Sequence, residues 1–141
     1  MKNKFIYLVL LSIFAFNQLF AENLNIQSLN ISIDKKTKLT IFKGEVVAVD
    51  EKNNILKTEY AEYKKGLKLL ESKDKTNILT SQGYNILGTN MIFDNENNYI
   101  SSKYPATVTD LDNNNIYVEN FEYSTEKFFF KSSGKIKVVD N

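Results

Sequence analysis

The chain lacks cysteine, histidine, tryptophan and arginine, and it has one proline and five glycines among 141 residues. No disulfide can stabilise it, and no thiolate or imidazole is available as a zinc ligand, nucleophile or general base. All 18 basic residues are lysines, so no guanidinium can bind phosphate or carboxylate in a bidentate manner. With 17 acidic residues the net charge is +1, which gives no strong field to attract nucleic acid. The composition favours a binding, carrying or structural protein, or an enzyme that uses only carboxylates, Lys, Ser or Tyr.

The N-terminus has the layout of a secretory signal peptide. Lys2 and Lys4 precede an apolar run over residues 5–16, and Ala21 supplies a small residue before the predicted cut. The run of 12 residues is shorter than the roughly 20 residues that a membrane-spanning helix needs. We therefore predict a signal peptide over residues 1–21 and one exported domain over residues 22–141. An uncleaved anchor over residues 5–21 is the alternative.

The 120 residues after this cut repeat with a period of 30. Written in four rows of 30, they align without a gap, and one column holds Ile33, Tyr63, Phe93 and Tyr123. Periods of 20–50 residues are typical of proteins in which each unit buries its apolar face against its neighbours. Further apolar columns are Ile26, Leu56, Ile86 and Ile116; Ile31, Ala61, Met91 and Phe121; Leu39, Leu69, Tyr99 and Phe129; Val46, Thr76, Ala106 and Ile136; and Ala48, Ile78, Val108 and Val138.

Each row is predicted to consist of short antiparallel strands. Apolar and polar residues alternate around Ile31 and Ile33, and turn-forming residues recur about every 10 positions. The best helix candidate, residues 58–72, is rejected because Gly66 interrupts it and the equivalent segment over residues 120–132 is strand-like. We predict an all-β domain with about three strands per row, or about a dozen in all.

Side-chain parity predicts one apolar face and one solvated face for each row. Before the central turn of a row the odd-numbered residues are apolar, and after it the even-numbered ones are. Gly44, Gly134 and the step from Tyr104 to Pro105 occupy equivalent positions, which indicates a bulge or corner. Stacking four such rows carries the apolar columns along one axis, and the sheet must fold over itself to cover them. The expected result is an apolar trough.

Three segments carry a resemblance to a known family: Ile33–Lys36 (IDKK), Phe42–Val47 (FKGEVV) and Glu59–Tyr63 (EYAEY). Together with the period and the export signal, they resemble the OstA-like (LptA) family of lipopolysaccharide-export proteins of the Gram-negative periplasm. The resemblance spans residues 22–141. The middle rows depart from the family's Gly-Asn-Val type of strand, because residues 74–76 read DKT and residues 104–106 read YPA.

The resemblance implies an open, twisted β-jelly roll of four repeats in the periplasm, whose apolar interior holds the acyl chains of lipid A. It also implies partners that join end to end into a bridge between the membranes: homologous domains of an inner-membrane anchor and an outer-membrane translocon, or further copies of the chain. Unpaired end strands would allow such joining by strand addition. No cofactor is expected. The residues assigned to the lipid-binding groove are Ile31, Ile33, Phe42, Val46, Ala61, Tyr63, Met91, Phe93, Val108, Phe121, Tyr123, Phe130, Ile136 and Val138.

Two further hypotheses stay open. The chain is the N-terminal periplasmic domain of the outer-membrane translocon or a membrane-anchored relative, or it is a structural or adhesive β-repeat domain. The sequence shows no catalytic constellation, because no Ser or Tyr has a base beside it. Asp110–Asn114 resembles the opening of a calcium loop but lacks the required Gly and distant Glu, so we predict a turn and no metal site. The Lys43, Lys73 and Lys103 column is interpreted as a solvated face, with lipid phosphates as the alternative ligand.

Overall fold

Fourteen strands and one short 3-10 helix make up residues 24–140, the part of the chain that the computed structural model describes. The predicted signal peptide lies outside these residues. The prediction of an all-β domain is confirmed, with two strands more than the expected dozen. The elements are β1 (Leu24–Gln27), β2 (Asn30–Asp34), β3 (Leu39–Asp50), β4 (Ile55–Lys64), η1 (Lys65–Leu67), β5 (Leu69–Ser72), β6 (Thr76–Leu79), β7 (Asn85–Gly88), β8 (Ile92–Asp94), β9 (Tyr99–Ser102), β10 (Ala106–Thr109), β11 (Asn115–Val118), β12 (Phe121–Ser124), β13 (Phe129–Lys131) and β14 (Ile136–Val139).

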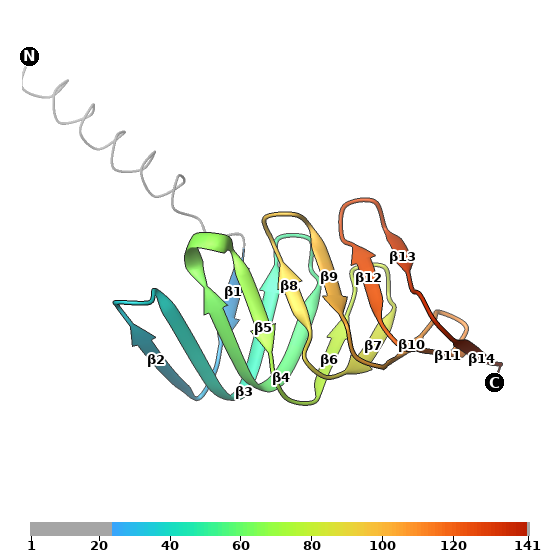
Figure 1. Ribbon diagram of the computed structural model, residues 1–141, viewed down its shortest axis with the longest axis horizontal. Coiled ribbons are helices and arrows are strands. Elements are labelled where there is room, and N and C mark those ends of the chain that lie inside the picture. Colours follow the sequence, from blue (N-terminus) through green and yellow to red (C-terminus); the bar gives the residue numbers. More distant parts are fainter. Residues whose placement is uncertain (1–23, 141) are drawn as a thin grey trace, which may run out of the picture.

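The strands form two facing layers along one long axis, from β2 at one end to β13 and β14 at the other (Figure 1). Layer A is defined by β2, β5, β8, β9, β12 and β13, and layer B by β1, β6, β7, β10, β11 and β14. The long strands β3 and β4 belong to both layers. Residues Leu39–Lys43 of β3 pair with β2 in layer A, and Val47–Asp50 pair with β1 in layer B. All pairings are antiparallel, and the result is one sheet folded over itself.

The period of 30 residues corresponds to one circuit of both layers. Residues 69–98 supply β5 and β8 to layer A and β6 and β7 to layer B, so each row adds two strands to each layer. The rejected helix over residues 58–72 is indeed absent: this segment contains the end of β4, the single turn η1 and β5. Within residues 24–140, no helix is long and apolar enough to span a membrane.

The chain passes between the layers along one long side of the molecule, which we call the crossing side. In β3 the crossing occurs at a bulge, where the register with β4 shifts between Lys43 and Val46. Gly44 has φ +77° there, a left-handed conformation that favours glycine, and a Cβ atom on it would lie 3.1 Å from a methyl group of Leu29. Gly134 takes φ +90° in the last row. The predicted corner at these glycines is confirmed.

The opposite long side, which we call the turn side, carries the tight turns at the ends of the strands. The Asp50 carboxylate accepts hydrogen bonds from the backbone N–H groups of Lys52 (2.9 Å) and Asn54 (2.8 Å). Asp110 repeats this arrangement 60 residues later with Asp112 and Asn114, both at 2.9 Å. Residues 110–114 thus form a turn, as predicted. Residues 24–140 contain no group of three acidic, His or Cys side chains that could hold a metal ion.

Candidate functional site

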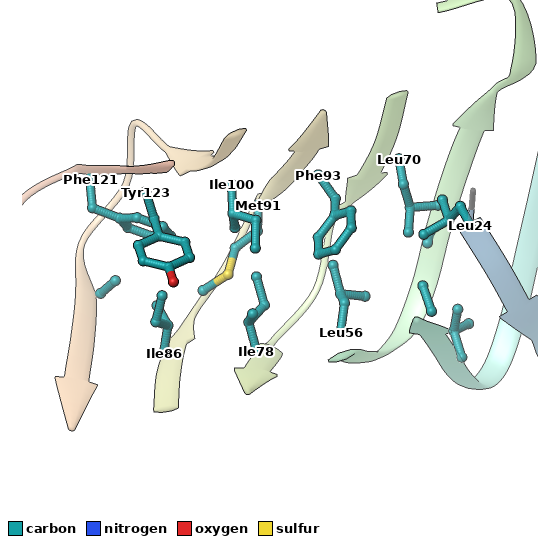
Figure 2. Packing of buried hydrophobic residues seen from close by; sticks show 14 of the residues in the cluster. Leu24, Leu56, Leu70, Ile78, Ile86, Met91, Phe93, Ile100, Phe121 and Tyr123 are labelled. Atoms are coloured by element: carbon teal, nitrogen blue, oxygen red, sulfur yellow. The ribbon is translucent and has the colours of Figure 1, made fainter. Parts of the chain in front are cut away.

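The inward faces of the two layers enclose a continuous apolar interior. Figure 2 shows Phe93 and Tyr123 of layer A pointing toward Leu56 and Ile86 of layer B. In the middle rows the side chains of the two layers pack against each other and are fully buried. Phe93 is 1% exposed, and Leu56, Ile78 and Ile100 are 0% exposed. The trough expected from the sequence is therefore filled by its own side chains along its middle.

The structure places the predicted groove residues in three environments. All of them face inward, as parity predicted, because they share strand faces with the buried cluster. Phe130 is half-buried and stacks on Phe121, with ring centroids 5.7 Å apart. Ile31, Ile33, Ile136 and Val138 are exposed. The buried members of the set are Phe42, Val46, Ala61, Tyr63, Met91, Phe93, Val108, Phe121 and Tyr123.

The interior opens to solvent at the two ends of the stack. At the N-terminal end, Ile31 and Ile33 of β2 are 58% and 66% exposed. At the C-terminal end, Ile136 and Val138 of β14 are 54% and 57% exposed. These residues continue the same apolar columns as the buried ones, but no further row covers them. A contiguous exposed apolar surface of this kind is typical of a binding or contact site.

Both ends also present unpaired strand edges. At one end β1 and β2 each pair with β3 alone, and at the other β13 pairs with β12 and β14 with β11. Each of these strands therefore has one row of backbone N–H and C=O groups without a strand partner among residues 24–140. Such an edge can accept a strand from another chain. Apolar side chains and free backbone groups thus occur together at each end.

Tyr123 carries the one buried side-chain polar atom without a hydrogen bond in residues 24–140. Its ring crosses the interior from layer A, and the residue is 1% exposed (Figure 2). Burial raises the pKa of its hydroxyl above the ordinary value of 10.0, and the nearby Thr80 hydroxyl, which does not reach hydrogen-bond geometry with it, offsets part of this rise. The hydroxyl therefore lowers stability in this closed form of the interior.

Replacing Tyr123 with phenylalanine is expected to raise the free energy of unfolding by about 1 kcal/mol at pH 7, because an unsatisfied hydroxyl is removed. Above pH 10 the unfolded wild type loses a proton that the folded form retains, so its stability falls by up to about 1.4 kcal/mol per pH unit. The Tyr123→Phe variant should lose that part of the decline. Urea titrations at neutral and alkaline pH measure both effects. Tyr117→Phe, at an exposed position, is the control, and a less stable Tyr123→Phe variant at pH 7 would contradict this account.

The outer surface is charged rather than apolar around the predicted lysine column. Lys73 lies 3.6 Å from Glu71 and 3.8 Å from Glu62, and Lys43 lies over the Tyr60 ring at 5.7 Å. These contacts agree with the interpretation of the column as a solvated face. A surface hollow of about 600 Å³ beside the Gly44 bulge is lined by charged and apolar side chains: Glu45, Lys57, Glu59 and Lys75 together with Val46, Val47 and Leu87.

Sequence reasoning missed a column of serines that fixes the crossing side. Ser72 accepts a hydrogen bond from the backbone N–H of Met91 (3.1 Å) and from the Thr76 hydroxyl (2.7 Å). One row later the Ser102 hydroxyl donates a hydrogen bond to the backbone carbonyl of Thr89 (3.0 Å). Two rows later the Ser132 hydroxyl donates one to the backbone carbonyl of Asn120 (2.7 Å). These hydroxyls satisfy polar groups where the strand ladder is interrupted. Their spacing of 30 residues was the signal that could have found them.

The fold is that of an open β-jelly roll, and comparison with solved structures agrees. No family model matches the chain, and no curated protein matches it by sequence. A solved structure matches with a TM-score of 0.70 at 14% identity, over 84% of this chain and 94% of the other. That structure is LptH of Pseudomonas aeruginosa, the LptA homologous periplasmic component of the conserved lipopolysaccharide transport device. The likeness shows that the two chains share a fold, and the prediction of an OstA-like fold is confirmed.

Proposed function

We propose that this chain is a periplasmic carrier that holds the acyl chains of lipopolysaccharide in its apolar interior, as one segment of a bridge between the inner and outer membranes. The observation that carries the proposal is an apolar interior that runs the length of the stack and is open at both ends. The shared fold with LptH, a periplasmic component of a lipopolysaccharide transport device, supports it. Removal of residues 1–21 on export is part of the proposal, and mass spectrometry of the exported protein would distinguish it from an anchored form.

The open ends are suited to receive hydrocarbon. Each methylene that leaves water contributes about 0.8 kcal/mol, so an acyl chain gains several kcal/mol by lying against a few exposed apolar side chains. Ile31 and Ile33 offer this surface at one end, and Ile136 and Val138 offer it at the other. Charged headgroups would stay outside, because the buried cluster between the layers is apolar and the one buried charged side chain among residues 24–140, Asp50, is held in a turn by hydrogen bonds from its own backbone neighbours.

Passage through the middle requires the two layers to separate. On the crossing side the layers are joined covalently, since β3 and β4 run through both. On the turn side Lys52 of layer B donates a side-chain hydrogen bond of 2.7 Å to Asn98 of layer A. A hydrogen bond of this kind contributes only about 1 kcal/mol. We expect the molecule to open along the turn side, where acyl chains would replace contacts between Phe93 and Leu56 (Figure 2).

The strand directions allow domains of this fold to join head to tail. Each layer contains eight antiparallel strands in order, so its two edge strands run in opposite directions. A domain placed beyond β13 and β14 in the same orientation would therefore meet both edges with antiparallel strands. Such joining continues the apolar columns from one domain into the next. The partners we propose are homologous domains of the inner-membrane anchor and the outer-membrane translocon.

Photo-crosslinking in living cells tests the proposal at one strand. A photoreactive residue at Val138, which faces the interior, is expected to capture lipopolysaccharide. The same residue at Lys137, whose side chain lies on the opposite face of β14, is the matched control and should capture little. Ile33 and Ser32 provide the same comparison at the other end. Capture of protein but no lipid at both inward positions would favour a structural or adhesive β-repeat domain instead.

A further inference from the structure

We infer that the C-terminal end of the stack selects a partner sheet edge that carries carboxylates on its outer face, in preference to the N-terminal end of a second copy of this chain. The inference rests on one part of the proposed function, namely that both ends of the stack bind neighbouring domains. It names the chemistry of the partner, which neither the fold nor the comparison specifies.

The charges along the stack are the first observation. Residues 22–38, at the N-terminal end of the proposed exported chain, contain three lysines and two acidic residues. Residues 126–140, at the C-terminal end, contain four lysines and two acidic residues. Between them, residues 39–125 contain nine lysines and 13 acidic residues. The N-terminal end therefore carries a net charge of +1, the C-terminal end +2 and the middle −4, so head-to-tail copies would bring like charges together.

The second observation is the strand register on the outer face of layer A. Lys131 of β13 pairs with Glu122 of β12. From Glu122, a line of directly paired residues crosses layer A strand by strand and ends at Ser32 of β2. A second copy that extends layer A without a register shift would place its Ser32 opposite Lys131. A serine hydroxyl at that position carries no charge, so Glu122 on the chain's own β12 would remain the one carboxylate directly opposite Lys131.

Layer B leads to the same result. Lys137 of β14 pairs with Tyr117 of β11. The corresponding line of directly paired residues across layer B ends at Gln27 of β1. In the same arrangement Gln27 of a second copy would face Lys137. No ion pair within residues 24–140 involves Lys131 or Lys137. In this arrangement the residues directly opposite the two lysines, Ser32 and Gln27, are uncharged. The nearest carboxylate on the outer face of β2 is that of Asp34, two residues from Ser32, and β1 has none.

A partner edge with Asp or Glu opposite these two lysines would satisfy both. Directly opposed residues on neighbouring strands lie close enough for opposite charges to attract and like charges to repel. The attraction acts between exposed groups, so it weakens as salt rises. The partner that fits is therefore an antiparallel edge with apolar residues on its inner face and acidic residues on its outer face.

The experiment gives the chain itself an acidic edge. Sedimentation equilibrium of residues 22–141 would compare the wild type with a Gln27→Glu, Ser32→Glu variant at low and high salt. Both substituted positions are exposed, so the variant should fold. We expect it to self-associate about tenfold more tightly than the wild type at low salt, with most of this gain lost at high salt. Adding Lys131→Gln and Lys137→Gln should remove the gain.

A neutral variant, Gln27→Asn with Ser32→Thr, is the matched control and should behave like the wild type. The inference is overturned if the acidic variant associates no more tightly than this control, or if the wild type self-associates tightly at low salt without salt dependence. Lipid plays no part in these measurements. If lipid capture at Val138 failed while the charge-dependent association held, the proposed function would fall and this inference would stand.

Discussion

Replacing Phe93 with aspartate is expected to lower the free energy of unfolding by at least about 4 kcal/mol. Loss of a buried phenylalanine alone costs about 3–5 kcal/mol, and an unpaired carboxylate in the same place adds to the cost. Phe93 is 1% exposed and lies between Leu70 and Ile100 in the register of layer A. Since a domain of this size is stable by about 5–15 kcal/mol, much of the protein should unfold. Urea denaturation followed by circular dichroism measures the change.

Two variants separate this effect from a general sensitivity of the strand. Phe93→Leu keeps an apolar side chain and is expected to cost about 1–2 kcal/mol. Ile92→Asn changes the neighbouring residue, which is half-buried on the outer face of β8, and should cost about 1 kcal/mol, well below the cost of Phe93→Asp. If Phe93→Asp were as stable as the wild type to within 1 kcal/mol, water would already reach the interior, and the closed core described here would be wrong.

Deleting residues 128–141 is expected to leave a folded, shorter stack that no longer makes the proposed junction at that end. The deletion removes β13 and β14, each of which pairs with a single neighbour among the described strands. It also removes Phe130 from the face of Phe121, at a cost of about 1–3 kcal/mol. Because repeats interact mainly with their neighbours, the remaining rows should persist. Circular dichroism would report the fold, and crosslinking to partner domains in cells would report the joining.

The control for the deletion keeps both edge strands. Phe129→Ser changes a residue that is exposed and faces outward, so the variant should fold and still join its partner. Loss of all β structure on deletion would contradict a stack held together by neighbouring rows. Undiminished joining would show that the partner binds elsewhere than at β13 and β14.

The arrangement of the strands could be predicted from the sequence because the same pattern occurs in four repeats. A single segment such as residues 58–72 was ambiguous, since its apolar residues also fit a helix. Its equivalent over residues 120–132, with three consecutive phenylalanines, fits a strand and removed the ambiguity. The corner at Gly44 was found in the same way, from the equivalent Gly134.

The sequence did not predict how far the interior is open. Parity shows which face of a strand is apolar, but the gap between two layers depends on how their side chains interdigitate. Phe93 and Leu56 come from different columns and meet across that gap. Protein interiors pack to the density of organic crystals, so such columns close on each other unless a ligand holds them apart. The sequence therefore predicted a trough where the middle rows form a closed core.

The exposure of the end residues could not be read from their columns either. Ile33 shares a column with Phe93 and Tyr123, yet it is exposed while they are buried. The difference lies in position, because a residue in the first or last row has a neighbour on one side only. The same reasoning applies to Val138, which shares its column with the buried Ile78. In a stack, the repeat gives the direction of a side chain, and the distance from the end gives its exposure.

The most direct test of the account is lipid capture in the middle of the stack. A photoreactive phenylalanine analogue at position 93 would replace a buried aromatic side chain in cells that export the protein, with position 92 on the opposite face as the control. If the proposed function holds, we expect a lipopolysaccharide adduct at position 93 and little at position 92, since acyl chains passing through the interior would displace the contacts of Phe93. A folded, exported protein that captures no lipid at position 93, or equal amounts at both positions, would contradict it.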